Sequence, residues 1–418
     1  MIKLPKKINT IIKTLESSSF RAYAAGECVR QSILGQSPLD WDIITNASSS
    51  DLEKLFPGAS ALNKRGVMRL DYTSEDESEI IADIIPLKKE EDFVKSAESF
   101  LKTLDFTVNA IGDNPSEKLC DPCDARGDMS KKLIKATGNA SEQLVKDPIR
   151  ILRAMRLAAE MGYDLTKDLH AAILENRDKL KNVPYSDIRE EFELLLQAPD
   201  AGKGLKMIAA TEVLPYILGD GVNHLTRRQN NDFLEYCENV HKIKPILLSR
   251  LGLLLICFDR RKGLKMLEIL GYEGEEQQHL TDSLTLMEKL YFLKDEKSLK
   301  KFLGSVGLER YNYVNTVAKA QRIVYDFPET RIVGRIELLK IIKSKGDPIF
   351  VEDLAIDAED LIEAGIATPE NAGRLLQMLL DIVHKKPARN TKQALLSEAK
   401  RLSKNKFAML TRKVEWLR

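Results

Sequence analysis

Hydrophobic and polar positions follow two different patterns along the 418-residue chain. From about residue 20 to residue 135, short β-prone runs are separated by clusters of Gly, Pro, Ser and Asn, which predicts strands joined by turns. These runs are 22–25, 42–44, 67–72, 79–85 and 106–111. Before them, residues 1–20 alternate lysines with isoleucine and leucine at helical spacing, which predicts an amphipathic helix and is not typical of a signal peptide.

From about residue 140 onward, apolar residues recur at intervals of three and four, which is the period of an α-helix. The helices predicted in this way are 147–161, 168–181, 186–197, 203–210, 245–258, 297–305, 311–324, 335–344, 358–364, 370–384 and 391–403. This order of elements predicts an α+β fold, in which a small mixed head with a β-sheet precedes an elongated all-helical remainder.

Composition narrows the class of protein. With 43% apolar and 30% charged residues the chain is globular, and its length predicts roughly two to four domains. The longest apolar run, 245–258, is interrupted by Arg250 and is shorter than the roughly 20 residues that a bilayer requires, so we expect no membrane span. Five cysteines are too few for a disulfide-stapled secreted fold, which favours a cytoplasmic location.

Charge is distributed unevenly, although the formal net charge is only +1. Residues 385–418 carry eleven Lys or Arg and two Glu, a net charge of +9, which leaves a net charge of −8 on everything before them. A solvated helical tail explains such a segment as well as a contact with a nucleic-acid backbone does. Charge by itself therefore leaves both interpretations open.

Two aspartates enter one of the predicted strands. Asp40 and Asp42 project from the same side of that strand, because side chains two residues apart share a face. Adjacent carboxylates repel unless a hard divalent cation lies between them, and Mg²⁺ takes carboxylate oxygens while sharing its other positions with phosphates. An Asp-x-Asp pair also arises by chance in solvated turns, so its meaning depends on the residues around it.

Those surrounding residues favour a phosphate and a metal. Gly26 precedes a predicted helix, whose start favours an anion, and Arg30 lies one turn further on as a donor of charge-assisted hydrogen bonds. In the predicted strand 79–85, either Glu79 or Asp83 can supply a third carboxylate, although Glu79 follows an acidic, solvent-like run. We therefore expect a phosphate-binding loop beside a pair of metal ligands.

A second candidate site lies where the helical pattern begins. Asp147 is a predicted N-cap, followed by Pro148 at the first helical position. Arg150, Arg153 and Arg156 then recur every three residues with no alternating acids to pair with. Three unpaired arginines on one line favour a polyanion over a solvated basic face.

The pair Asp147 and Arg150 also matches the edges of two nucleobases. An aspartate accepts hydrogen bonds and an arginine donates them. Cytosine and adenine each present an amino donor beside a ring-nitrogen acceptor, whereas guanine and uracil present the opposite polarity. One fixed Asp/Arg pair can therefore accept C and A while rejecting G and U.

In this order and spacing, the motifs resemble those of the class II tRNA nucleotidyltransferases, the family of the CCA-adding enzymes and their poly(A) polymerase relatives. The segments that carry the resemblance are 26–35, 40–43, 105–110 and 147–156. The C-terminal stretch 347–390 resembles the tail of the bacterial CCA-adding enzymes. The resemblance thus covers nearly the whole chain, although residues 220–330 contribute little.

The resemblance implies a reaction and a role for each residue. Asp40 and Asp42 would be catalytic and bind two Mg²⁺, and Glu79 would complete the acidic site. The residues implied to bind nucleotide are Gly26, Glu27, Arg30, Asp105, Asn109, Asp147, Arg150, Arg153 and Arg156. Among these, Asp147 and Arg150 would read the base without a nucleic-acid template. The implied reaction adds C and A from CTP and ATP to the 3′ end of tRNA.

The resemblance also implies an organisation into four parts. These are a nucleotidyltransferase head over 1–137, a base-recognising neck over 138–200, a helical body over 201–290 and a tRNA-binding tail over 291–418. The basic C-terminal end would hold the tRNA body, and no obligate protein partner is expected.

Several positions depart from the family pattern. Gly26 is followed by Glu27 where the family has a second glycine, and Thr103 and Leu104 replace paired arginines. The segment before Asp105 is shorter than usual, in a region whose loss marks members restricted to adding CC. A CC-only enzyme, a poly(A) polymerase and a catalytically weakened RNA-binding paralogue therefore remain alternatives, although the intact aspartate pair favours an active enzyme.

Overall fold

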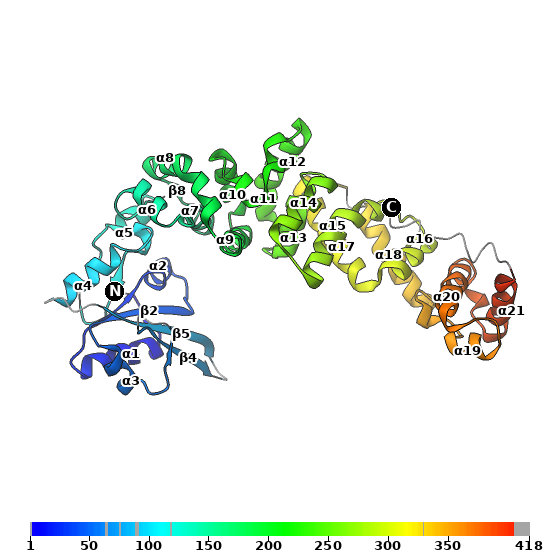
Figure 1. Cartoon of the computed structure of the whole chain (residues 1–418), viewed down its shortest axis with the longest axis horizontal. Coiled ribbons are helices and arrows are strands. Elements are labelled where there is room, and N and C mark those ends of the chain that lie inside the picture. The colour runs from blue at the N-terminus through cyan, green and yellow to red at the C-terminus, as the bar shows by residue number, and fades with distance from the viewer. Residues whose placement is uncertain are drawn as a thin grey trace. The chain divides into compact units, whose positions relative to one another are not determined.

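The structure is a computed structural model that describes residues 2–62, 66–74, 77–87, 92–117, 119–328 and 330–404, with only the backbone of 72–74, 77–79 and 330–332. The chain divides into two compact units, Met1–His224 and Leu225–Arg418. Each unit is described by itself, with its elements labelled as in Figure 1.

The described residues of the first unit form a six-stranded mixed sheet with the order β3-β4-β5-β2-β1-β6. The strands are β1 (Ala22–Ala25), β2 (Asp40–Thr45), β3 (Ser60–Ala61), β4 (Met68–Ser74), β5 (Glu77–Pro86) and β6 (Gly112–Asp113). The central strands β2 and β5 run parallel, and their other pairings in this sheet are antiparallel. A separate two-stranded parallel ladder joins β7 (Leu133–Ile134) to β8 (Asp164–Leu165).

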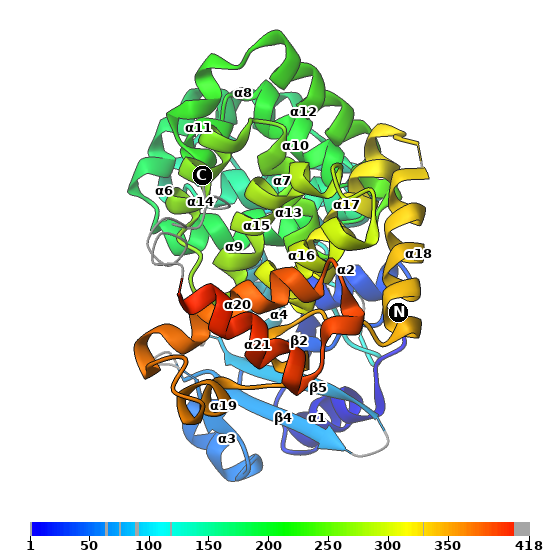
Figure 2. The same cartoon turned by 90° about the vertical axis from the view of Figure 1, so that its right-hand side faces the viewer.

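Four helices surround the sheet. They are α1 (Lys6–Ser17), α2 (Glu27–Ile33), α3 (Ser49–Leu55) and α4 (Phe93–Leu101). Helices α1 and α3 lie below the sheet in both views (Figures 1 and 2), and α1 buries its isoleucines and Leu15 against β1 and β2. Helix α4 covers the other face, where Phe93 stacks on Tyr23 with ring centroids 5.5 Å apart. Ile44 of β2 belongs to the hydrophobic cluster on this second face.

The rest of the first unit is helical. Its elements are α5 (Ala125–Ser130), α6 (Ala140–Lys146), α7 (Arg150–Met161), α8 (Lys167–Asn176), α9 (Tyr185–Gln197), α10 (Ala201–Ala210) and α11 (Leu214–Leu218), with the 3₁₀ turns Thr107–Asn109, Arg177–Asn182 and Asp220–His224. Helix α7 packs against α9 and α10. A Cβ atom on Gly204 would lie 3.0 Å from Leu195 and 3.1 Å from the Ala159 side chain, so glycine allows this close packing.

The second unit is all-helical within its described residues. Its helices are α12 (Arg227–Asn239), α13 (Leu247–Ile256), α14 (Arg260–Leu270), α15 (Gly274–Leu290), α16 (Glu296–Val306), α17 (Leu308–Tyr325), α18 (Thr330–Lys345), α19 (Ala358–Glu363), α20 (Pro369–Val383) and α21 (Lys392–Ser403). Helix α13 packs against α14, α15 and α17, which explains its nearly continuous leucine sequence. Leucines of α20 pack with residues of α19 and α21 in a separate cluster.

The predicted α+β fold is confirmed, with a mixed sheet in the head and helices after it. The predicted strands 22–25, 42–44, 67–72 and 79–85 correspond to β1, β2, β4 and β5. In the described part of the chain, no helix is both long and apolar enough to cross a membrane. The spacing of apolar residues did not predict α12, α14 or α15, which are polar on average.

The prediction of a strand at 106–111 is wrong. Residues Thr107–Asn109 form a 3₁₀ turn instead. The Asp105 carboxylate accepts hydrogen bonds from the Phe106 backbone N–H at 2.8 Å and from Asn109 Nδ2 at 3.2 Å. These local side-chain bonds favour a turn over an extended strand, because they satisfy polar groups within a few residues.

We expect the substitution Ile12→Ala to destabilise the head by about 2–5 kcal/mol, because Ile12 is buried between α1 and the sheet and truncation leaves a cavity. The measurement is urea unfolding followed by fluorescence of the buried Trp41, in a Trp416→Phe background. The exposed neighbour Lys13→Ala provides the control, with a midpoint close to that of the parent. Equal midpoints for both variants would contradict the packing of α1.

Candidate active site

Two aspartates open the central strand β2. In the register of the sheet, Asp42 lies opposite Asp83 of β5 on one side and opposite Ala25 of β1 on the other. Directly paired residues of neighbouring strands share a face, so Asp40, Asp42 and Asp83 project from the same face of the sheet. The two β2 aspartates are exposed, whereas Asp83 is buried.

The carboxylate of Asp83, the third acid on this face, forms an ion pair with an arginine. Arg69 of β4 donates from Nε to one Asp83 oxygen and from an NH group to the other, each at 2.7 Å. This bidentate pair holds Asp83 in place and uses both of its oxygens. The competing candidate, Glu79, has a side chain outside the described residues.

Negative charge crowds the start of β2. Desolvation raises the pKa of Asp42 to about 7, and repulsion from Asp40, Asp83 and Glu27 adds to the shift, while Arg69 opposes it. Desolvation and the charge of Asp83 also raise the pKa of Asp40. The Asp42 side chain is exposed to solvent, yet the protein atoms around it partly desolvate its carboxylate. The exposed pair Asp40 and Asp42 offers the oxygen donors that suit a hard divalent cation, while the described residues contain no group of three or more His, Cys, Asp or Glu placed to hold a metal ion.

The turn between β1 and α2 closes over these aspartates. Gly26 has φ +85°, a left-handed conformation that favours glycine. A Cβ atom at this position would lie 3.6 Å from Asp42 Oδ2, so the turn brings bare backbone next to the carboxylate. The structure therefore places Gly26 and Asp42 together, as the sequence predicts.

Arg30 lies behind this turn and is almost fully buried, with 2% of its surface exposed. Its Nε donates to Asn109 Oδ1 at 2.8 Å. One of its NH groups lies 2.9 Å from Glu27 Oε1 in an ion pair, but the geometry at the NH group is not that of a hydrogen bond. Gln31 Nε2 donates to the same Glu27 oxygen at 2.7 Å. Asn109, Glu27 and Gln31 thus form one connected polar cluster around Arg30.

The polar contacts continue from the head into α7. Asn109 contacts Asp105, and the Asp105 carboxylate accepts from an NH group of Arg153 at 3.3 Å. Arg153 Nε then donates to Glu191 Oε1 at 3.1 Å, and Arg156 Nε donates to Glu191 Oε2 at 2.7 Å. Glu191 of α9 therefore bridges two arginines of α7.

The expectation of three unpaired arginines is wrong. Arg153 pairs with Asp105 and Glu191, and Arg156 pairs with Glu191 and with Glu160 of its own helix. Most of these acids come from segments distant in sequence, so the pattern of α7 alone did not show them. A polyanion contacting this face must therefore compete with protein carboxylates.

Asp147 and Arg150 form a separate pair at the start of α7. Arg150 Nε donates to Asp147 Oδ2 at 3.3 Å, and an NH group of Arg150 donates to Gln143. Among the described residues, no protein group hydrogen-bonds the second Asp147 oxygen or the second Arg150 NH group. The pair thus keeps one acceptor and donors available side by side.

The prediction that Asp147 caps this helix is wrong. Asp147 is the C-cap of α6, and α7 begins three residues later at Arg150. The backbone N–H of Asp147 donates to the Gln143 carbonyl, and its side chain turns to the Arg150 guanidinium. The N-cap of α7 is Ile149, and the Asp147 carboxylate accepts from a side chain, whereas an N-cap side chain accepts from a backbone N–H of the first turn.

The basic C-terminal segment is described only up to Lys404, so the predicted RNA contacts of residues 405–418 lie outside the described residues. Within the described part, Arg389 and Arg401 pair with Glu398, and Lys392 pairs with Asp360. Some of the positive charge counted in the sequence is therefore balanced locally.

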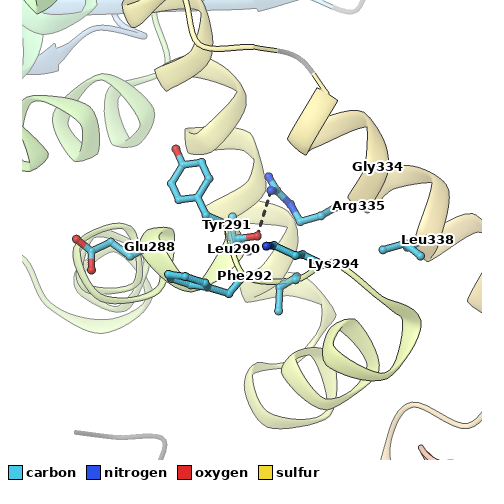
Figure 3. A pocket seen from close by; sticks show the side chains of 9 residues that line it. Glu288, Leu290, Tyr291, Phe292, Lys294, Gly334, Arg335 and Leu338 are labelled. Atoms are coloured by element: carbon cyan, nitrogen blue, oxygen red, sulfur yellow. Dashed lines mark hydrogen bonds between the residues drawn. The ribbon is translucent and has the colours of Figure 1, made fainter.

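Two cavities lie in the second unit. One of about 660 Å³ is lined by Tyr291, Phe292, Lys294 and Arg335 among others (Figure 3). Buried Arg335 donates there to the Leu290 carbonyl at 3.2 Å, at the C-terminal end of α15. The other cavity, of about 670 Å³, is lined by residues of α12 to α15 and α17. Neither cavity contains any of the predicted site residues.

Reasoning from the sequence did not find Glu191. Its signal is present in α9, where the apolar positions Ile188, Phe192 and Leu195 recur at helical spacing and Glu191 lies on the same face. Glu191 is 8% exposed, and a charged residue at such a position requires a partner. Buried acids on apolar helix faces are therefore a guide to hidden arginine partners.

The substitution Glu191→Gln is expected to weaken local stability by about 1–3 kcal/mol, because Arg153 and Arg156 lose their shared carboxylate while each keeps one other acid. The measurement is hydrogen–deuterium exchange, which should report faster exchange of α7 and α9 amides. The adjacent exposed residue supplies the control Glu190→Gln, which should leave both helices protected. Unchanged protection in Glu191→Gln would show that the bridge is not stabilising.

Comparisons with known proteins agree with this architecture. The family described as "Poly A polymerase head domain" matches residues 22–135, and "Probable RNA and SrmB- binding site of polymerase A" matches residues 162–221. The chain is 25% identical to the CCA-adding enzyme of Leuconostoc mesenteroides over 88% of this chain and 89% of that protein. It is 26% identical to the CCA-adding enzyme of Lactiplantibacillus plantarum over 95% and 96%.

Solved structures share the fold. The CCA-adding enzyme of Bacillus stearothermophilus in complex with CTP superposes with a TM-score of 0.75 at 23% identity, covering 95% of this chain and 97% of that one. The Thermotoga maritima CCA-adding enzyme complexed with tRNA gives a TM-score of 0.65 at 18% identity, covering 95% of each. The chain thus matches the poly(A) polymerase head-domain family over residues 22–135 and its RNA-binding region over residues 162–221, and it is similar over most of its length to CCA-adding enzymes and shares their fold.

Proposed function

We propose that the protein adds C and A nucleotides from CTP and ATP to the 3′ end of tRNA without a nucleic-acid template. The observation that carries this proposal is the exposed pair Asp40 and Asp42 beside the Gly26 turn, in the same unit as the Asp147–Arg150 pair. The first pair would supply a centre for phosphoryl chemistry, and the second would supply a reader for C and A. Relatives that cover nearly the whole chain are named CCA-adding enzymes, which supports the same conclusion.

Asp40 and Asp42 are the residues that would hold Mg²⁺. Their carboxylates are exposed, lie on one face and are crowded by further negative charge, which is a donor set suited to a hard cation. When bound, Mg²⁺ would neutralise triphosphate charge and lower the pKa of the RNA 3′-hydroxyl. Glu79 remains our candidate for the third acid, because both oxygens of Asp83 are bound by Arg69.

Other residues of the head would bind and orient the nucleotide. The absence of a side chain at Gly26 would let phosphate oxygens approach the backbone beside Asp42. Arg30 would supply positive charge from behind the turn, held in place by Asn109. Asp105 would keep Asn109 and Arg153 in position through its two carboxylate oxygens.

The base would be selected at the start of α7. The Asp147 oxygen without a protein partner would accept the amino group of cytosine or adenine, and an Arg150 N–H would donate to the neighbouring ring nitrogen. Guanine and uracil would place a carbonyl oxygen against the Asp147 oxygen and a ring N–H against the Arg150 N–H. Both hydrogen bonds would then be lost. Arg153 and Arg156 would contact triphosphate or ribose, after exchange with the acids that now hold them.

We assign the parts of the chain accordingly. The head over 1–137 would carry out catalysis, the neck over 138–200 would read the base, and the tail over 291–418, which follows the helical body over 201–290, would bind tRNA. Contacts alone divide the chain more coarsely, between His224 and Leu225. The names of the relatives favour CCA addition over CC-only addition, poly(A) synthesis or a weakened paralogue.

Incubation with Mg²⁺, labelled CTP or ATP, and tRNAs that end before C74, C75 or A76 distinguishes these activities. Under these conditions, Asp40→Asn should reduce incorporation by about three orders of magnitude or more, because one carboxylate for the metal is lost. Binding of tRNA should stay close to that of the parent. The control Asp178→Asn removes an exposed carboxylate from the turn Arg177–Asn182 and should keep full activity. Substantial incorporation by Asp40→Asn would refute its metal-binding role.

The substitution Asp147→Ala should relax base selection. The ratio of kcat/KM for CTP and ATP to that for UTP and GTP should fall about 5- to 100-fold, since the fixed acceptor for the amino group is removed. Steady-state kinetics with all four nucleotides measure this ratio. Glu142→Ala, an exposed acid of α6, is the matched control and should preserve selection. Unchanged selection in Asp147→Ala would exclude it as the base reader.

A further inference from the structure

We propose that Glu27 is a built-in competitor of the nucleotide triphosphate, whose carboxylate occupies the anion-binding side of Arg30 until a nucleotide displaces it. This inference deepens the proposed function and rests on it. It concerns the first residue of α2, which directly follows Gly26.

The first observation is the state of Arg30. The side chain is 2% exposed, and its Nε is bound to Asn109 Oδ1 at 2.8 Å. One NH group has no hydrogen-bond partner of suitable geometry among the described residues and is itself buried. The guanidinium is therefore fixed at one edge and keeps donor capacity at the other. A buried arginine in this condition favours an anion.

The second observation is what covers that edge. Glu27 Oε1 lies 2.9 Å from the same NH group, in an ion pair with imperfect hydrogen-bond geometry. The Glu27 side chain is 44% exposed whereas that of Arg30 is 2% exposed, so the acid lies on the solvent side of the arginine. Rotation of the Glu27 side chain toward solvent would uncover the guanidinium without any change in the backbone. Gln31 opposes this rotation through its 2.7 Å hydrogen bond to the same oxygen.

The third observation is the position of Glu27 relative to the metal ligands. Glu27 directly follows Gly26, where a Cβ atom would lie 3.6 Å from Asp42 Oδ2, so its backbone begins next to the metal ligands. A triphosphate that approached this surface would meet Glu27 as an additional negative charge close to its own oxygens. The carboxylate would therefore oppose triphosphate binding both by occupying Arg30 and by direct repulsion.

The consequence is a lower apparent affinity for nucleotides. If only a fraction of molecules has Glu27 turned away, the apparent dissociation constant increases by the inverse of that fraction. Glu27→Gln keeps the shape and removes the charge, so it should weaken the hold on Arg30. We expect the KM for CTP and for ATP to fall about three- to tenfold, with kcat changed less than about twofold.

The experiment compares the parent with Glu27→Gln and Glu27→Ala in full-length protein, by steady-state incorporation into tRNA and by equilibrium binding of CTP. Glu53→Gln removes an exposed acid from α3, below the sheet, and is the control for net charge. Gln31→Ala, which frees Glu27 from its hydrogen bond, should lower KM in the same direction by a smaller factor. Inhibition by cytidine, which lacks phosphate, should be the same for every variant.

Several outcomes would overturn the inference. These are an unchanged or higher KM in both Glu27 variants, an equal shift for cytidine, or an equal shift in Glu53→Gln. A loss of kcat with an increased requirement for Mg²⁺ would assign Glu27 to the metal instead. The proposed function has a separate test, which is the incorporation of C and A by the parent protein. Tighter CTP binding by Glu27→Gln would support the inference even if no incorporation occurred in the parent.

Discussion

The parallel pairing of β2 with β5 is the constraint on which the candidate site depends. It sets Asp42 opposite Asp83, and the antiparallel pairing of β4 with β5 then sets Arg69 opposite Asp83. A shift of one residue in either register would turn these side chains to the opposite face of the sheet. The sheet thereby exposes two aspartates at the start of a central strand and pairs the third with an arginine.

Polar contacts extend this placement from the sheet to the helices. Arg30, Asn109, Asp105 and Arg153 follow one another in contact, and Arg153 leads on to Glu191. Each member has partners on two sides, so the loss of one leaves another buried charge without compensation. Helix α7, near whose start the base would be read, is thus tied to α2, which follows the Gly26 turn beside Asp42. Accurate placement of a nucleotide requires such a rigid connection.

Every arginine proposed to contact the nucleotide is already engaged by a protein group. Arg150 contacts Asp147, Arg153 and Arg156 share Glu191, and Arg30 faces Glu27. Internal acids keep these cations ordered and limit nonspecific attraction of other anions. A nucleotide would then bind by exchanging one set of ion pairs for another, which makes affinity depend on the strength of the internal pairs.

The sequence by itself determined the strands β1, β2, β4 and β5, the helical remainder and the shared face of Asp40 and Asp42. These features follow from alternation and from helical periodicity, which depend only on neighbours along the chain. It did not determine the partners of the charged residues. Arg30 meets Asn109 from 79 positions away, and Arg156 meets Glu191 from 35 positions away. Whether an arginine is free or paired was decided only by tertiary structure, since such pairs require distant segments to pack together and exclude water.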